Sequence, residues 1–217
     1  MRFFLAAMLI IALPGVSVAQ GDRSETWDVS LSAIFQDSKK LGGEGGSTLD
    51  IKSDVGFGIN FAYNWTNKLA LGMDIEFLRP KYQATLIDET GAEPDLVIRR
   101  DMSQVNTRFK GTFNLLEGPF TPYLEAGLGW SFFDSNVADG PPITGCWWHP
   151  ILGYVCSNYY STYNDTLFSY GAGVGLRYEF NFGGFVKASY NYWEMDKLGK
   201  SGDPAFESAR IEFGRRF

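Results

Sequence analysis

The stretch that decides the fold is Val55-Gly56-Phe57-Gly58-Ile59-Asn60-Phe61-Ala62-Tyr63-Asn64-Trp65. Its odd-numbered positions carry bulky apolar side chains, and its even-numbered positions carry glycine, alanine or asparagine. Successive side chains of a β-strand point to opposite faces of the sheet. A period of two therefore predicts a strand with one large apolar face and one small polar face.

Seven further segments alternate in the same way, some of them more weakly. They cover residues 27–35, 69–77, 104–115, 123–132, 168–180, 185–195 and 206–217. The connections between the eight segments differ in length. Three are short, at residues 66–67, 117–121 and 181–184, and four are long, near residues 37–53, 83–99, 134–165 and 196–205. Short turns at one rim and long loops at the other are typical of a barrel in an outer membrane.

Alternation alone is also compatible with a second kind of barrel, a soluble one whose apolar face surrounds a ligand. The lumen of an eight-stranded barrel is barely wide enough for its own side chains. The 18 Phe, 11 Tyr and 6 Trp of this chain cannot share that space, whereas the small and charged residues can. We therefore expect the aromatic residues to face lipid, together with the other bulky apolar side chains, among them Phe57, Ile75 and Leu128. The prediction is an all-β fold, an eight-stranded antiparallel up-and-down transmembrane β-barrel.

The first 19 residues have the pattern of a secretory signal peptide. Arg2 gives a positive start, residues 3–13 are apolar, and Ser17-Val18-Ala19 offers small residues for cleavage after Ala19. A buried N-terminal helix is the alternative. The predicted domains are thus a signal peptide at 1–19 and an outer-membrane barrel at 20–217, with both chain ends at the short-turn rim and no further domain after Phe217.

Length and composition exclude several classes of protein. The chain has 217 residues, enough for one domain of ordinary size. Hydrophobic residues make up 45% and charged residues 20%, which argues against disorder. The formal net charge of −6 argues against a nucleic-acid partner, because such proteins need a basic face.

The last nine residues have a pattern that resembles that of a known protein family. In Ala209-Arg210-Ile211-Glu212-Phe213-Gly214-Arg215-Arg216-Phe217, apolar residues alternate back from a terminal aromatic residue. The chain here resembles the small outer-membrane β-barrel family, which includes the OmpA transmembrane domain and its OmpX- and OmpW-like relatives. The resemblance implies that Ile211, Phe213 and Phe217 act as an assembly signal. Arg215 departs from the family pattern, where an apolar residue is usual.

The same resemblance implies a location and partners. We expect export to a bacterial outer membrane, contact with outer-membrane lipid and with the barrel-assembly machinery, a monomer, and no cofactor. The family contains surface proteins, narrow channels for small solutes, and a few enzymes of the outer leaflet.

The inward face carries equal numbers of opposite charges. The six acids are Asp28, Asp74, Glu76, Glu125, Glu179 and Glu212. The six bases are Arg108, Lys110, Arg177, Lys187, Arg210 and Arg216. Charges removed from water need partners, so we predict an ion-pair network that plugs the lumen. The alternative is that about a third of these side chains lie at the rims in water without a partner.

The longest connection holds two further candidates. Cys146 and Cys156 are the only cysteines, and export to an oxidising compartment favours a disulfide over a metal site. Exposed aromatic residues on a loop are typical of a contact surface, although they also pack over a barrel mouth. The aromatic residues in question are Trp147, Trp148, Tyr154, Tyr159 and Tyr160.

The sequence predicts a structural or adhesin-like role through the loops, with a host or surface ligand as partner. A narrow passive channel is the alternative. An enzyme of the outer leaflet comes third, because the sole histidine, His149, lies in a loop and no His-Ser-acid set falls on the strands.

Overall fold

The protein is described by a computed structural model that covers residues 22–42, 46–87, 96–196 and 204–217. The predicted signal peptide lies outside these residues. Strands make up nearly all of the described chain. No helix among the described residues is long and apolar enough to cross a bilayer.

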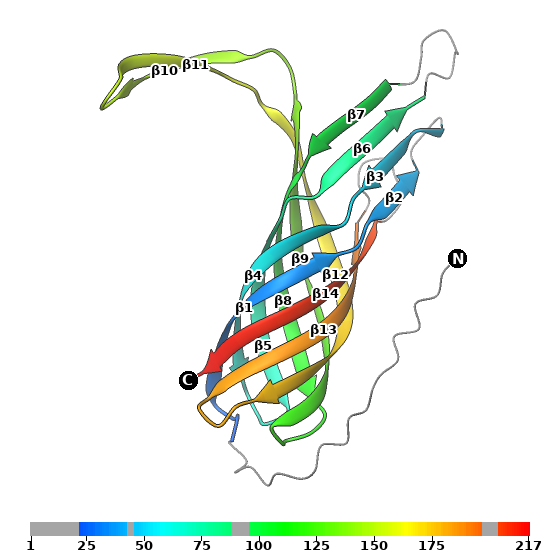
Figure 1. The fold of residues 1–217 in the computed structure, drawn as a ribbon, viewed down its shortest axis with the longest axis vertical. Coiled ribbons are helices and arrows are strands. Elements are labelled where there is room, and N and C mark those ends of the chain that lie inside the picture. The colour runs from blue at the N-terminus through cyan, green and yellow to red at the C-terminus, as the bar shows by residue number, and fades with distance from the viewer. Residues whose placement is uncertain (1–21, 43–45, 88–95, 197–203) are drawn as a thin grey trace.

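Eight antiparallel strands close into a barrel in the order β1-β14-β13-β12-β9-β8-β5-β4 (Figure 1). Their bounds are β1 Thr26–Gln36, β4 Asp54–Asn64, β5 Leu69–Leu78, β8 Ser103–Asn114, β9 Phe120–Ala138, β12 Thr162–Glu179, β13 Gly184–Met195 and β14 Ala205–Arg216. The first and last strands close the ring, with Asp28 opposite Arg216. This architecture confirms the predicted eight-stranded up-and-down barrel.

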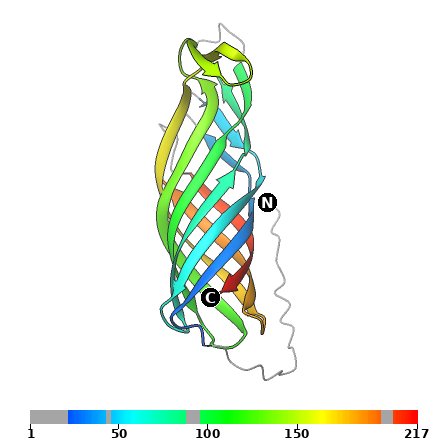
Figure 2. The same ribbon diagram turned by 90° about the vertical axis from the view of Figure 1, so that its left-hand side faces the viewer.

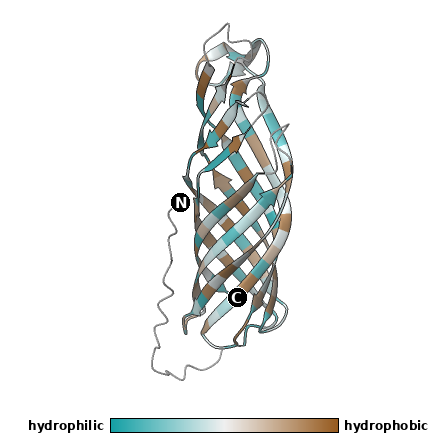
Figure 3. Ribbon diagram, turned by 90° about the vertical axis from the view of Figure 1, so that its right-hand side faces the viewer, coloured by the Kyte–Doolittle hydropathy of each residue, from teal (hydrophilic) through white to brown (hydrophobic). Residues whose placement is uncertain are grey.

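The bulky apolar face of the wall points outward. Phe57 is 60% exposed and Leu128 is 46% exposed, whereas Asn60 and Asp74 on the other face are buried. Hydrophobic and hydrophilic residues alternate along the strands (Figure 3). A chain with such a surface requires lipid or detergent around it, because so large an apolar area is not tolerated in water.

Not every large side chain faces outward, which corrects the expectation that the aromatic residues as a class face lipid. Tyr123, Phe185 and Trp193 are buried inside the barrel. Glycines stand opposite two of them and leave the room they need. A Cβ at Gly175 would lie 2.5 Å from the Tyr123 ring, and one at Gly171 would lie 2.8 Å from the Trp193 ring.

The described parts of the first three predicted long loops are largely strands, which is a second correction. The first two connections form a four-stranded sheet in the order β2-β3-β6-β7, and the third forms a hairpin (Figure 2). The bounds of the sheet strands are β2 Lys39–Gly42, β3 Thr48–Ile51, β6 Lys81–Leu86 and β7 Leu96–Asp101. The hairpin strands are β10 Ile143–His149 and β11 Gly153–Tyr159. Their alternation is short and irregular, so the sequence pattern did not reveal them.

An apolar cluster fills the end of the barrel from which the long connections leave, here called the loop end. The opposite end, with the short connections, is called the turn end. The cluster comprises Leu41, Ile51, Tyr82, Met102, Phe133, Leu167, Met195 and Phe206. Tyr82 donates a hydrogen bond to the carbonyl oxygen of Ser135 at 3.0 Å, and burial raises the pKa of its hydroxyl. The four-stranded sheet and the wall are thus joined by one core.

Candidate functional site

The barrel interior holds the first candidate, a central group of charges at mid-height. Asp74 lies 2.5 Å from Lys110 and 2.5 Å from Arg210. Glu76 pairs with Arg108 at 2.8 Å and also with Arg210. The remaining pairs join Lys110 to Glu125 at 3.1 Å, Arg210 to Glu212 at 3.3 Å and Lys187 to Glu212 at 3.7 Å.

Two residues stabilise the central group from the side that faces the loop end. The guanidinium carbon of Arg108 lies 4.0 Å from the ring centroid of Trp193, so a cation–π contact holds it in place. Asn106 donates a hydrogen bond to Glu76 at 2.9 Å. Charges this deeply buried are stable only with such partners, because leaving water costs each of them several kcal/mol.

A second group of charges closes the turn end. Arg177 lies 2.5 Å from Asp28 and 2.7 Å from Glu179, and Glu179 also lies 3.1 Å from Arg216. Every one of the twelve predicted network residues therefore has an oppositely charged group within 4 Å. They form two groups rather than one, since no ion pair among the described residues links the two sets.

Sequence reasoning missed Arg23, which completes the second group. Its Nε lies 2.7 Å from Glu179, and its side chain is 1% exposed. Arg23 precedes β1, so it belongs to no alternating pattern that would have assigned it to the interior. No other signal in the sequence identifies it.

The interior is tightly filled at the level of the central group. A cavity of about 20 Å³ lies there, lined by neighbouring uncharged residues and by six charged ones, namely Asp28, Asp74, Lys110, Glu125, Lys187 and Glu212. That volume is about enough for a single water molecule. The arrangement supports a plug better than a pathway for solutes.

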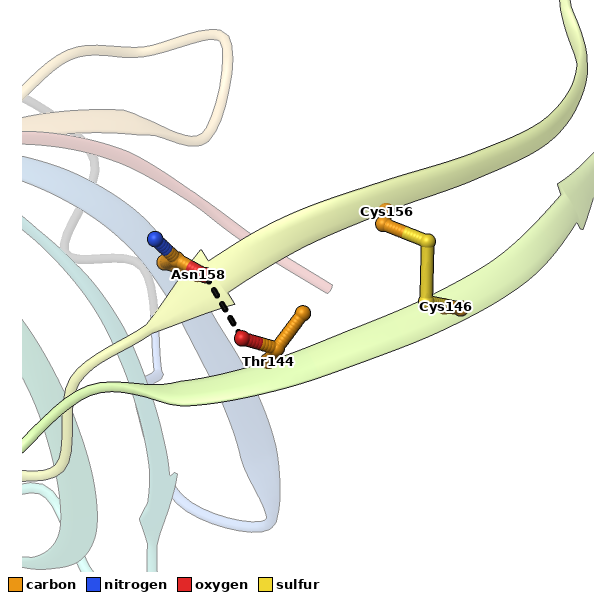
Figure 4. The surroundings of a disulfide bond; sticks show 4 residues. All are labelled: Thr144, Cys146, Cys156 and Asn158. Atoms are coloured by element: carbon orange, nitrogen blue, oxygen red, sulfur yellow. Dashed lines mark hydrogen bonds between the residues drawn. A yellow bond between two sulfur atoms is a disulfide. The ribbon is translucent and has the colours of Figure 1, made fainter.

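The β10–β11 hairpin is the second candidate site. β9 and β12 are 19 and 18 residues long, so they continue past the loop end of the wall and carry the hairpin, which leans away from the barrel axis (Figure 1). Cys146 and Cys156 face each other across its two strands and form a disulfide (Figure 4). Thr144 donates a hydrogen bond to Asn158 at 2.9 Å, two residues nearer the root.

The hairpin presents apolar side chains at its turn. Trp148 and Tyr154 stand opposite each other, and Pro150, Ile151 and Leu152 form the connection between the strands. His149 accepts hydrogen bonds through Nδ1 from the backbone N–H groups of Ile151 and Leu152, both at 3.2 Å. Tyr160, at the root, is 57% exposed. The side chains of Trp147 and Tyr159 lie outside what the structure describes.

The residues of the predicted assembly signal lie on the outer face of the last strand. Ile211 is 40%, Phe213 is 66% and Phe217 is 68% exposed. The backbone of Phe217 exchanges two hydrogen bonds with Trp27, of 2.8 and 2.9 Å. Arg215 also points outward and lies 5.7 Å from the Phe217 ring centroid.

Little in the described chain resembles a catalytic or metal centre. No group of three or more His, Cys, Asp or Glu side chains suited to a metal ion occurs among the residues described. His149 lies at the hairpin turn, where its Nδ1 is engaged with the backbone.

Comparison with known proteins gives a family match over nearly the whole chain. Residues 5–217 match the outer membrane protein beta-barrel domain. No curated protein matches the chain.

Several solved structures share the fold. OprG from Pseudomonas aeruginosa has a TM-score of 0.56 at 13% identity, covering 91% of this chain and 98% of its own. Neisserial surface protein A has a TM-score of 0.53 at 16% identity, covering 88% and 95%. Ail, the attachment invasion locus protein of Yersinia pestis, was solved with the heparin analogue sucrose octasulfate and has a TM-score of 0.51 at 16% identity, covering 89% and 99%.

Proposed function

The chain belongs to the outer membrane protein beta-barrel domain family, and from this we propose that it is a closed outer-membrane anchor that presents its β10–β11 hairpin to a surface partner. The match agrees with the resemblance predicted from the C-terminal segment. In such barrels the short turns face the periplasm and the long connections face the outside. On this assignment the loop end, the four-stranded sheet and the hairpin are extracellular.

The observation that carries the proposal is the exposure of the hairpin turn. Trp148 and Leu152 are each 71% exposed, and Ile151 is 87% exposed. Side chains of this size are rarely left in water on a raised, covalently clamped element unless they contact something else. Aromatic residues with little rotamer freedom are also the usual anchors of binding surfaces.

The relatives give this role a context. The attachment invasion locus protein has the same architecture, and we extend an attachment role from it to this chain. We do not extend the ligand of that protein to this chain. Sucrose octasulfate is a polyanion, and the chain has no Lys or Arg anywhere between Lys110 and Arg177, a range that includes the entire hairpin. We therefore expect the hairpin to use apolar contacts.

A passive channel is the less favoured alternative. The tightly filled interior argues against it, because ten ion pairs of the predicted network occupy the lumen. An enzyme is less favoured still, since the one histidine is used at the hairpin turn.

Binding of whole bacteria to coated surfaces tests the proposal. The N–H of Asp139 donates to the carbonyl oxygen of Ser161 at 2.6 Å, so an Asn-Gly turn joining these two residues removes the hairpin without disturbing the ladder below. We expect cells that carry this variant to bind at least tenfold less to surfaces coated with matrix protein or host-cell membrane.

The matched control is Lys40→Ser/Arg99→Ser, which changes two exposed basic residues on the four-stranded sheet and leaves the hairpin intact. It should bind as the unmodified protein does. Heat-modifiable migration on gels verifies that both variants are folded. Unchanged binding of the hairpin-less variant contradicts the proposal.

A further inference from the structure

We infer that the turn of the hairpin inserts into the hydrocarbon of an apposed lipid bilayer with zwitterionic headgroups. This inference rests on the proposed surface role and names its partner. The inserting unit is residues 148–154, here called the apolar tip.

The shape of the apolar tip suits a fluid partner. Tyr154 is 69% exposed, and together with Trp148, Ile151 and Leu152 it forms a convex end. A convex apolar end needs a matching pocket in a protein partner, whereas a bilayer closes around it without complementarity. The composition also fits, because aromatic residues favour the interface and aliphatic residues favour the acyl region just below it.

Charged residues are absent from the hairpin segment that would enter the bilayer. Residues 140–164 contain no Asp, Glu, Lys or Arg. A buried charge in hydrocarbon costs several kcal/mol, so a run of 25 residues without one removes the main obstacle to insertion. It also removes the groups with which a protein or glycan partner would normally form ion pairs.

The backbone of the apolar tip is prepared for a dry environment. Turns normally leave N–H groups to water, and an unpaired N–H in hydrocarbon is strongly disfavoured. Here the His149 ring accepts hydrogen bonds from the N–H groups of Ile151 and Leu152, whose side chains are among the most exposed of the apolar tip. Two of the donors that would oppose insertion are therefore already satisfied.

The height of the hairpin favours insertion into a second, apposed bilayer rather than into the membrane that holds the barrel. The 19 residues of β9 rise about 42 Å at a tilt of ~45°, while the hydrocarbon band of an outer membrane is ~25 Å thick. The hairpin leaves the far end of this strand and leans away from the axis (Figure 1). Its root therefore lies well above the lipid that surrounds the barrel.

The charges around the root of the hairpin determine which lipid headgroups the apposed bilayer should carry. Asp134, Asp139 and Asp165 flank the hairpin, and no Lys or Arg lies between Lys110 and Arg177. A hairpin strand of 7 residues spans about 23 Å, so these carboxylates repel an anionic surface at low ionic strength, where the Debye length is ~30 Å at 0.01 M salt. We therefore expect a zwitterionic bilayer to be preferred.

Vesicle flotation tests the inference. The full protein in nanodiscs is mixed with phosphatidylcholine vesicles or with vesicles containing phosphatidylglycerol, and the fraction that floats is measured. We expect flotation with phosphatidylcholine, at least threefold less with phosphatidylglycerol at low salt, and at least tenfold less for Trp148→Ser/Ile151→Ser/Leu152→Ser. These three side chains are so exposed that the variant should fold normally. Lys40→Ser/Arg99→Ser serves as the control and should float like the unmodified protein.

Two results would overturn the inference, and they differ from failure of the proposed function. Absence of flotation by the unmodified protein excludes a lipid partner, and undiminished flotation of the triple serine variant excludes insertion of the apolar tip. If that triple variant nevertheless loses whole-cell binding to matrix protein, the surface role stands with a protein partner. If both assays are unaffected, the inference and the proposed function fail together.

Discussion

Arg23 and Glu179, 156 residues apart in the sequence, form an ion pair of 2.7 Å inside the turn end of the barrel. The Arg23 guanidinium also donates to the carbonyl oxygens of Asn67 and Leu116, both at 3.3 Å, and of Gly118 at 2.5 Å. One side chain therefore ties the segment before β1 to two of the short turns. The barrel is closed at this end by a residue that belongs to none of its strands.

Replacing Arg23 should destabilise the barrel. Arg23→Ala removes four hydrogen bonds and leaves Glu179 with Arg177 and Arg216 only, so we expect a loss of about 1–3 kcal/mol in the free energy of unfolding. Urea unfolding in lipid vesicles measures the change. Lys68→Ala is the matched control, because its pair with Glu117 at the same end is exposed and should contribute less than about 1 kcal/mol. Equal effects of the two variants would show that Arg23 has no special role.

Removal of Arg210 should be more damaging than removal of Arg23. Arg210 contacts Asp74, Glu76 and Glu212, so Arg210→Met leaves three buried carboxylates with fewer partners. Breaking a buried pair in this way typically costs 3–5 kcal/mol. We expect a lower urea midpoint, or loss of folding, in the same assay. The variant Arg215→Met, on the outer face of the same strand, should have little effect.

A plugged interior predicts no conduction. The cavity at the central group has a volume of about 20 Å³, so a hydrated ion has no path through it. Purified protein in planar bilayers should give no discrete conductance steps at moderate voltage. Reproducible steps from protein freed of porin contaminants would restore the channel hypothesis.

The disulfide should stabilise the hairpin but not the barrel. β10 and β11 form a sheet of their own, separate from the barrel. On the chain-entropy estimate, closing a loop of 10 residues contributes ~3 kcal/mol. Cys146→Ser/Cys156→Ser should therefore speed proteolysis within residues 140–160 and leave the urea midpoint of the barrel unchanged. A lowered midpoint would mean that the hairpin supports the wall.

The terminal aromatic residue should matter for assembly more than for stability. The Phe217 side chain is exposed, and its backbone bonds to Trp27 do not depend on its identity. If Phe217 is part of an assembly signal, Phe217→Ala should reduce the amount of folded protein in the outer membrane of cells. Unassisted folding into lipid vesicles should remain close to that of the unmodified chain. A deficit of equal size in both assays would instead indicate a packing role.

The sequence alone determined the barrel wall. A period of two is local, and only one assignment of faces fits bulky residues such as Phe57 and Leu128 outside a narrow lumen. The inward position of charged residues such as Asp74 and Arg210 followed from the same alternation of side chains along each strand.

Tertiary structure decided which charges meet and what the long connections become. Asp74 and Arg210 lie 136 residues apart in the sequence. Their contact depends on closure of the barrel and on the length of the two side chains, and the alternation along each strand specifies neither. Arg23 lies outside any strand, so its burial depends on turns distant in sequence. The strands at the loop end are short, and pairing and the shared apolar cluster stabilise them rather than a pattern of their own.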